Sequence, residues 1–356
     1  MENFETQLND FLNTGVEKGA SDIHFSPGYY PTIRVDGLLV PLADKKILTK
    51  SEIEGMAKVL LGADRQAMFA ERKEADFSYQ VGQNLRFRVN VYETRGSMAC
   101  VLRHISDTVR TIDELRLPEQ VKIFSTISQG FVLLAGPTGH GKSTTLAAII
   151  QAINAERTEK IITIEDPIEY IFTPERSIID QREVGSDTRS FAGALRSSFR
   201  ENVNVIMVGE LRDYETMSAA VTAAETGHLV LGSIHTNDAP QTIERIIDIF
   251  PSGQQRQIIS QLANTLSGVV SQRLIPGITG GLVPAVEILV ANSAVRNIIR
   301  ENKIEQLNLA ITTGSQAGML SLNASLAGLV RNNQIALEQA QFYSPNLNEL
   351  QTLLKS

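Results

Sequence analysis

The first hundred residues of the chain carry two alternating patterns of apolar and polar positions. An amphipathic helix pattern comes first, with apolar residues on one helix face: Phe4, Leu8, Phe11 and Leu12. Residues 32–37 and 85–92 then alternate with a period of two, while residues 50–71 between them have a helical pattern. The second alternating segment places its apolar residues on one face: Phe87, Val89 and Val91. This mixture predicts an α+β domain with an antiparallel sheet.

From about residue 128 onward, short apolar strands alternate with helices. The predicted strands are 131–135, 161–164, 205–208 and 229–234. Helices are expected to start near residues 143, 190 and 214. This order predicts a parallel α/β core. After about residue 288 the pattern is helical again, with breaks at Gly314, Gly318 and the turn 344–346.

The length of the chain, 356 residues, favours two domains over one. We expect an N-terminal domain over residues 1–107 and an ATPase-type core over residues 119–290. The polar stretch 108–118, which ends in Pro118, is the best candidate for a linker between them. A helical C-terminal region is expected over residues 291–356.

Composition excludes several classes of protein. Hydrophobic residues make up 42% and charged residues 21% of the chain, as in a globular protein. The single cysteine, Cys100, excludes a disulfide framework or a four-cysteine zinc module within the chain. No apolar run approaches the ~20 residues of a membrane span, and the N-terminus lacks signal-peptide features, so a cytoplasmic location is expected. A net charge of −7 argues against a protein that mainly binds nucleic acid.

A phosphate-loop motif lies between a predicted strand and a predicted helix. The sequence Gly136-Pro-Thr-Gly-His-Gly-Lys-Ser143 fits the pattern G-x-x-x-x-G-K-[ST]. Its glycines allow a sharp turn and a close approach of the backbone to phosphate, and its N–H groups favour an anion. We expect Lys142 to neutralise the β- and γ-phosphates of a nucleotide and Ser143 to ligate Mg²⁺. The nucleotide-contacting residues are predicted to be Gly136, Pro137, Thr138, Gly139, His140, Gly141, Lys142, Ser143 and Thr144.

Two carboxylates follow predicted strands of the same core. Glu165 and Asp166 come directly after strand 161–164, just before Pro167. Glu210 follows strand 205–208 and one glycine, in the manner of a Walker B motif. Ligands bind at the carboxyl edge of a parallel sheet, so these acids are candidates for contact with Mg²⁺ or the attacking water. The alternative is a pair of solvated turn carboxylates.

Two histidines, His228 and His235, bracket the strand 229–234. We expect both to face the γ-phosphate side of the sheet edge, where a polar side chain can respond to the loss of phosphate. The alternative is that each histidine is hydrogen-bonded at a domain or subunit contact.

Taken together and in this order, the clusters resemble the secretion ATPase superfamily. The chain contains a Walker A loop, an Asp box (ITIEDPIEYIF), an atypical Walker B motif (VIMVGELRD) and a His box (GHLVLGSIHTNDA). Within the superfamily it resembles the retraction ATPases of type IV pili. ASDIHFSPGYYPTIRVDG matches the N-terminal signature, LRFRVNVYETRGSMACVLRHI the end of the first domain, and AVRNIIREN a C-terminal motif of retraction-type members.

The resemblance implies a fold and an assembly. The first domain would be PAS-like and the second RecA-like, with a helical C-terminal region. Copies of the chain would form a homo-hexameric ring that holds ATP and Mg²⁺ between the two domains. The ring would drive pilus retraction and touch an inner-membrane platform protein from the cytoplasmic side.

The resemblance also assigns roles to individual residues. Glu210 would be the catalytic carboxylate and Glu165 an acid that orients metal or water, so that Ser143, Glu165 and Glu210 would surround Mg²⁺. His228 and His235 would act as His-box residues. Among the arginines of the first domain, Arg88 and Arg103 match the positions that reach the γ-phosphate. Arg86 shares a strand face with Arg88, which leaves the choice between these two open.

Several alternatives remain open at this point. An extension-type pilus or secretion ATPase shares the four clusters, although such members usually carry the zinc module that this chain lacks. An accessory retraction paralogue, a nucleotide-regulated binding module and a nucleic-acid motor are the others. His140 departs from the family, which usually has a small residue there. A tolerated variation is favoured over a contact with phosphate or a pH-dependent effect on nucleotide affinity.

Overall fold

The computed structural model describes residues 4–35, 37–82, 85–105 and 108–355. The chain forms two compact units. The first contains residues 1–108 together with 167–171, and the second contains residues 109–166 and 172–356.

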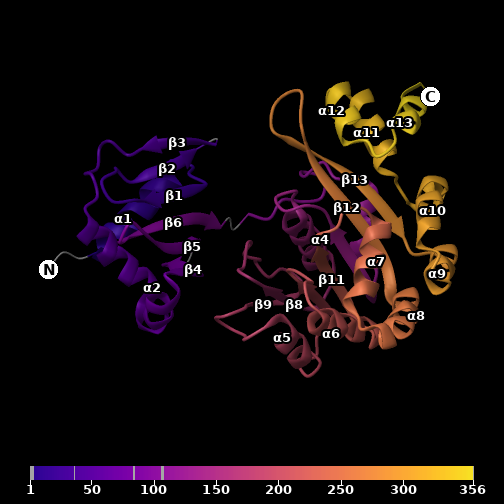
Figure 1. The fold of residues 1–356 in the computed structure, drawn as a ribbon, viewed down its shortest axis with the longest axis horizontal. Helices are drawn as coiled ribbons and strands as arrows, with labels where there is room; N and C mark the ends of the chain where they lie inside the picture. Colours follow the sequence, from indigo (N-terminus) through magenta and orange to yellow (C-terminus); the bar gives the residue numbers. More distant parts are fainter. Residues whose placement is uncertain (1–3, 36, 83–84, 106–107, 356) are drawn as a thin grey trace. The chain divides into compact units, whose positions relative to one another are not determined.

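The first unit is a six-stranded antiparallel sheet with helices on one face (Figure 1). The strand order is β3-β2-β1-β6-β5-β4. The strands are β1 Asp22–Phe25, β2 Thr32–Val35, β3 Leu38–Pro41, β4 Glu74–Val81, β5 Leu85–Thr94 and β6 Ser97–Ile105. Helices α1 Phe4–Glu17 and α2 Lys50–Arg72 pack against it. The predicted α+β domain with an antiparallel sheet is therefore confirmed.

The alternation predicted for residues 85–92 explains the core of this unit. Phe87, Val89 and Val91 on β5 are completely buried. They pack in one cluster with Leu8 and Leu12 of α1, because successive strand residues point to opposite faces. The other face of β5 carries polar side chains.

A capping box starts α2. Thr49 Oγ1 accepts a hydrogen bond from the backbone N–H of Glu52, and the Glu52 carboxylate accepts one from the backbone N–H of Thr49 at 2.8 Å. Burial alone raises the pKa of Glu52, but hydrogen bonds from Lys46 and Thr49 outweigh burial and hold this pKa at about 2. The ionised carboxylate therefore fixes the start of the helix.

The second unit is built on a seven-stranded sheet with the order β13-β12-β7-β11-β10-β8-β9. All neighbouring pairs are parallel except β12 with β13. The strands are β7 Gly130–Ala135, β8 Lys160–Glu165, β9 Ile178–Glu183, β10 Val205–Val208, β11 Leu229–Ile234, β12 Leu266–Pro276 and β13 Leu282–Val290. The first helices are α3 Ile123–Thr126, α4 Lys142–Glu156, α5 Phe191–Ser198, α6 Tyr214–Glu225, α7 Ala239–Ile249 and α8 Gln255–Thr265. The predicted parallel α/β core is confirmed.

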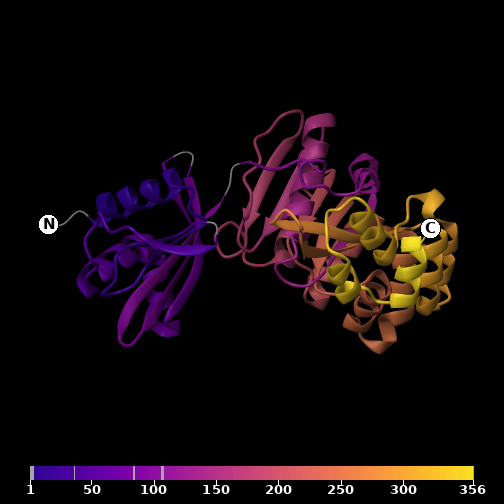
Figure 2. The same ribbon diagram turned by 90° about the horizontal axis from the view of Figure 1, so that it is seen from above.

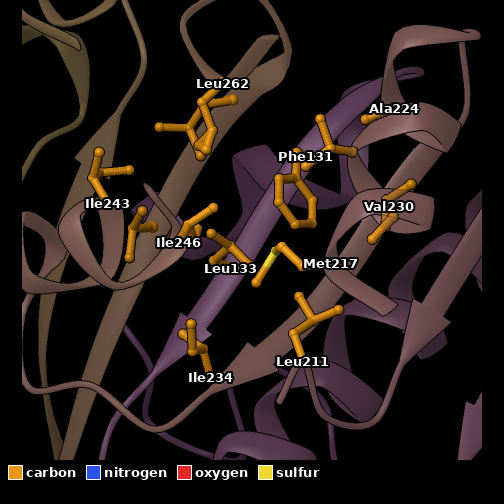
Figure 3. Packing of buried hydrophobic residues seen from close by; sticks show 14 of the residues in the cluster. Phe131, Leu133, Leu211, Met217, Ala224, Val230, Ile234, Ile243, Ile246 and Leu262 are labelled. Carbon is orange, nitrogen blue, oxygen red and sulfur yellow. The ribbon is translucent and has the colours of Figure 1, made fainter. Parts of the chain in front are cut away.

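Helices cover both faces of this sheet, as parallel strands require. Phe131 and Leu133 of β7 pack with Met217 of α6, Ile246 of α7 and Leu262 of α8 (Figure 3). The alternate residues of β7 are also buried and face the side on which α4 contacts the strand. The buried sheet thus holds β7, β8, β10 and β11 at fixed register, so their carboxyl ends meet at one edge.

The C-terminal helices belong to the second unit; the last three pack on the hairpin of β12 and β13 (yellow in Figure 2), and the first two pack on α7 and α8. They are α9 Ser293–Arg300, α10 Leu307–Thr313, α11 Leu322–Arg331, α12 Leu337–Tyr343 and α13 Leu347–Lys355. The helical breaks at Gly314, Gly318 and 344–346 lie between helices, as predicted. Among the described residues, no helix is both long and apolar enough to cross a membrane.

The stretch 108–118 differs from the linker expected there. Residues 109–118 belong to the second unit, and Ile112 and Leu117 are buried in it. Thr111 and Glu114 exchange hydrogen bonds that close a turn. Its polar side chains suggested a linker, but its two apolar residues attach the stretch to the second unit.

Candidate nucleotide-binding site

The phosphate loop runs from the end of β7 to the start of α4. Gly136 has a φ of 145°, and a side chain there would place its Cβ 2.5 Å from the backbone oxygen of Gln272. Gly141 caps α4 with a φ of 78°, in the left-handed region that favours glycine. The helix begins at Lys142, so its first backbone N–H groups are directed toward the loop. Backbone shape and helix dipole together fit a phosphate group.

Lys142 is almost completely buried behind the loop, with 7% of its surface exposed. Its ammonium donates to the carbonyl oxygens of Gly136 and Pro137, each at 2.9 Å. Its Nζ also lies 3.3 Å from Nδ1 of His235. An ammonium forms stronger hydrogen bonds with an ionised phosphate than with a carbonyl, so this side chain is poised to bind phosphate.

Glu210 is held in place from both neighbouring strands. The N–H of Gly209 donates to the carbonyl of Ile164 at 2.8 Å, and the N–H of Leu211 donates to the carbonyl of Ser233 at 2.9 Å. Burial raises the pKa of Glu210, but a hydrogen bond from Arg212 and the charge nearby outweigh it, so the pKa is lowered overall. The side chain is therefore an ionised carboxylate that can accept a proton or a hydrogen bond.

His235 joins the two motifs. Its Nε2 lies 3.2 Å from Oε1 of Glu210, and its Nδ1 faces Lys142 and, at 3.4 Å, Oγ1 of Thr138. A neutral imidazole with its proton on Nε2 satisfies both contacts, because Nδ1 then accepts from the ammonium while Nε2–H donates to the carboxylate. The structure thus brings Lys142, Glu210 and His235 together.

Glu165 ends β8, at the same edge of the sheet as the phosphate loop, and is 6% exposed. Its Oε1 accepts hydrogen bonds from Thr163 Oγ1 at 2.6 Å and from Gln181 Nε2 at 3.3 Å. Ser143 and Thr144 lie in the first turn of α4 and are partly exposed. Hydroxyl and carboxylate oxygens are the donors that Mg²⁺ prefers, although the described residues contain no group of three or more His, Cys, Asp or Glu side chains that could hold a metal ion by themselves.

Sequence analysis missed the part of the site that β12 supplies. Gln272 on this strand accepts a hydrogen bond from Thr145 Oγ1 and donates one to the carbonyl of His140, both at 2.8 Å. Because β12 itself was not predicted, no pattern indicated that Gln272 lies against the phosphate loop. The phosphate-loop motif identifies the residues of the loop but not the β12 residue that supports them.

A cavity of about 570 Å³ lies beside the loop, entirely within the second unit. Its walls are Gly141, Thr144 and Thr145 near the loop, the segment 110–117, and parts of the β12–β13 hairpin. Its size is that of a small-molecule site. The stretch that was expected to be a linker therefore forms a wall of this cavity.

The expectation that both histidines face the phosphate side is wrong for His228. This residue precedes β11, and its carbonyl accepts from the N–H of Gly130 at the start of β7. Its Nδ1 lies 3.0 Å from the carbonyl of Ala223, and its ring packs on Phe199. Parallel strands put their starts at one edge and their ends at the other, so His228 and His235 lie at opposite edges of the sheet.

The candidate arginines lie in the first unit, on the sheet face that does not pack on helices. Arg88 on β5 and Arg103 on β6 are directly opposite in the antiparallel register. Arg103 Nε donates to the buried carboxylate of Asp22 at 2.9 Å, and Arg88 Nη2 donates to Asp76 at 2.6 Å. Arg86, on the same face, donates to Ser78 at 2.7 Å. The carboxylates offset the repulsion between Arg88 and Arg103 and orient both guanidinium groups.

The chain is similar to pilus proteins along nearly its whole length. The model of the family "Type II/IV secretion system protein" matches residues 2–340. The type IV pilus retraction ATPase PilT of Pseudomonas aeruginosa is 42% identical over 339 residues, which cover 94% of this chain and 97% of that protein. A twitching motility protein of Neisseria gonorrhoeae is 43% identical over 317 residues, covering 89% of this chain and 84% of that one.

A solved structure agrees with these relatives. The crystal structure of the pilus retraction motor PilT with bound ADP matches with a TM-score of 0.90 and 42% identity, and the match covers 99% of both chains. The strand–loop–helix unit at Gly136–Ser143, with Glu210 and His235 against it, supplies the chemistry expected of such a protein. The chain belongs to the Type II/IV secretion system protein family, as an ATP-hydrolysing member similar to the pilus retraction ATPases.

Proposed function

We propose that this protein is the ATP-driven motor of type IV pilus retraction, and that it works as a homo-hexameric ring. The observation that carries the proposal is the junction of Lys142, His235 and Glu210 in a chain that is 42% identical to a retraction ATPase over 94% of its length. The junction supplies the hydrolytic chemistry, and the full-length similarity favours retraction over other uses of it.

In this proposal, the residues of the second unit divide the work of hydrolysis. Lys142 and the N–H groups of the loop bind the β- and γ-phosphates. Glu210, which its lowered pKa keeps ionised, orients the attacking water and accepts its proton. A Mg²⁺ ion held by Ser143, with Glu165 and Glu210 near it, would neutralise developing charge on the phosphates.

The cavity beside the loop is the proposed place of the nucleoside. It adjoins Thr144 and Thr145, which follow the phosphate-binding turn along α4. The segment 110–117 lies against the same cavity and follows the first unit directly in the chain. A nucleotide bound there would therefore contact this first segment of the second unit.

Arg103 and Arg88 are proposed to complete the site from the first unit. Their guanidinium groups are held by Asp22 and Asp76, and the side chain of Arg103 is 66% exposed, so it is accessible to a ligand. Closure of the first unit on ATP, and opening after hydrolysis, would give the ring two unequal arrangements, because the ligand binds them with different affinities. The proposed partner is an inner-membrane platform protein that the ring touches from the cytoplasmic side.

Deletion of the gene, followed by counting of surface pili, tests the direction of the motor. Cells without the protein are expected to carry excess pili that do not retract. A copy with Glu210→Gln should fail to restore retraction, although the purified variant should still bind ATP. Bald cells would instead indicate an extension motor and overturn the proposal.

A further inference from the structure

His140 is built into the support of the phosphate loop. Its Nδ1 accepts a hydrogen bond from the backbone N–H of Leu274 on β12 at 2.9 Å. Its own carbonyl accepts one from Gln272 Nε2 on the same strand at 2.8 Å. A small side chain at this position could not reach Leu274. The ring therefore adds a side-chain contact to the backbone contact that any residue would make.

The loop and β12 are in close contact at two further points. A Cβ on Gly136 would lie 2.5 Å from the carbonyl oxygen of Gln272. A Cβ on Gly141 would lie 2.8 Å from Nε2 of Gln272 and 3.4 Å from Leu274. The imidazole thus adds a hydrogen bond between β12 and a loop whose other parts already pack closely against this strand.

We propose that His140 is a positioning residue for nucleotide binding, whose neutral imidazole fixes the phosphate loop on β12 and whose protonation releases it. The inference rests on the proposed binding of nucleotide by this loop. A protonated imidazole carries N–H on both nitrogens, so it cannot accept from Leu274. The loop would then have to be ordered by the nucleotide itself, at a cost in affinity.

The surroundings favour the neutral ring. Burial lowers the pKa of His140, and the positive charges of Arg273 on β12 and Lys142 at the start of α4 lower it further. These are the charged groups that act on the ring from the two elements packed against it. The contact with Leu274 is therefore intact near neutral pH and is lost only in more acidic solution.

The test compares His140→Asn with His140→Ala in the full-length protein. Asparagine places Oδ1 near the position of Nδ1, so it can accept the same N–H, but it does not titrate. Binding of a fluorescent ADP analogue is measured between pH 5.0 and 8.0. Dividing each wild-type dissociation constant by that of His140→Asn removes the titration of the nucleotide and of groups that the two proteins share.

Three results are expected. At pH 7.5, His140→Asn recovers most of the wild-type affinity, while His140→Ala binds about tenfold more weakly, the effect of one lost hydrogen bond. The ratio of wild type to His140→Asn rises about tenfold toward pH 5.0. The ratio of His140→Ala to His140→Asn stays constant with pH. Circular dichroism checks that the variants are folded.

Two results would overturn the inference. Parallel pH curves for wild type and His140→Asn would show that protonation of the ring does not matter, and wild-type affinity in His140→Ala would show that the contact does not matter. Either result leaves nucleotide binding and the motor function intact. A protein that fails to bind ADP at every pH would overturn both proposals, whereas normal ADP binding without retraction would count against the motor alone.

Discussion

His235 Nε2 lies 3.2 Å from Oε1 of Glu210, while the other ring nitrogen lies 3.3 Å from the ammonium of Lys142. One imidazole therefore spans the phosphate-binding lysine and the acid assigned to the attacking water. A phosphate that draws the ammonium away removes one contact of the ring and leaves those with Thr138 and Glu210. We therefore expect the position of the Glu210 carboxylate to depend on the occupancy of the loop.

The two contacts of His235 can be separated by substitution. Asparagine at 235 places an oxygen near the position of Nδ1 and retains a partner for Lys142. Glutamine reaches the position of Nε2 and retains a partner for Glu210. If orientation of Glu210 limits hydrolysis, His235→Asn loses about 10²-fold or more in kcat, while His235→Gln loses less. Steady-state phosphate release with saturating ATP measures both.

Nucleotide affinity provides the control for this pair. Dissociation constants for ADP should change by less than about threefold in both variants, since one neutral contact of the lysine is a small part of phosphate binding. Equal turnover in the two variants would contradict the positioning role of His235.

Replacement of Lys142 tests the phosphate loop directly. Lys142→Ala removes the ammonium that donates to Gly136 and Pro137. Loss of a charge-assisted contact with phosphate should weaken ATP binding by about 10²-fold. Equilibrium binding of a fluorescent ATP analogue measures the loss. Unchanged affinity in the folded variant would place the phosphates elsewhere.

The sequence allowed the catalytic edge to be predicted because its residues follow strands that are apolar throughout. The strands 131–135, 161–164, 205–208 and 229–234 all lie within one residue of the observed bounds. They are buried on both faces, so a short run of apolar residues was sufficient to identify each strand. Lys142, Glu210 and His235 then followed from strand ends and motifs.

The support of the site was not predictable in the same way. Strand β9 reads Ile-Ile-Asp-Gln-Arg-Glu and lies at the sheet edge, where polar residues obscure the strand pattern. In β12, Gln272 is buried against the phosphate loop, so a polar residue interrupts the apolar run at a position set by tertiary contact. The prediction for His228 was wrong for another reason. The direction of β11 alone decides that the residue before the strand lies at one edge of the sheet and the residue after it at the other.

The capping box of α2 predicts a stability effect confined to the first unit. Thr49→Ala removes the acceptor of the Glu52 N–H, and loss of such a cap costs about 1 kcal/mol, up to about 2. Hydrogen exchange of amides in the buried strands of the first unit should report the change. Thr14→Ala, at a partly exposed position of α1, serves as the control and should change stability by less than about 0.5 kcal/mol. Equal effects of the two variants would argue against the cap.

Glu287 on β13 connects the hairpin to the segment that follows His235. Its Oε1 accepts the N–H of Ala239, the first residue of α7, at 2.9 Å. Burial raises the pKa of Glu287 to about 7, against the lowering effect of the Ala239 hydrogen bond, and Asp238 adds to the rise. The folded protein therefore holds a proton at this site over a pH range in which the unfolded chain has released it.

This raised pKa predicts that Glu287 makes the second unit less stable as pH rises. Between pH 4.5 and pH 7 the folded state binds more protons at this site than the unfolded state, so stability falls across that window by about 3 kcal/mol and then levels off. Glu287→Gln keeps an acceptor for Ala239 but cannot ionise, so its stability should lack this fall. Urea unfolding of wild type and variant at several pH values, followed by circular dichroism, gives the difference.

Glu338→Gln, at an exposed position of α12, controls for the loss of one negative charge. A difference between wild type and Glu287→Gln that is independent of pH, or one that matches the control, would mean that Glu287 is ionised throughout and that its link to α7 does not depend on a proton.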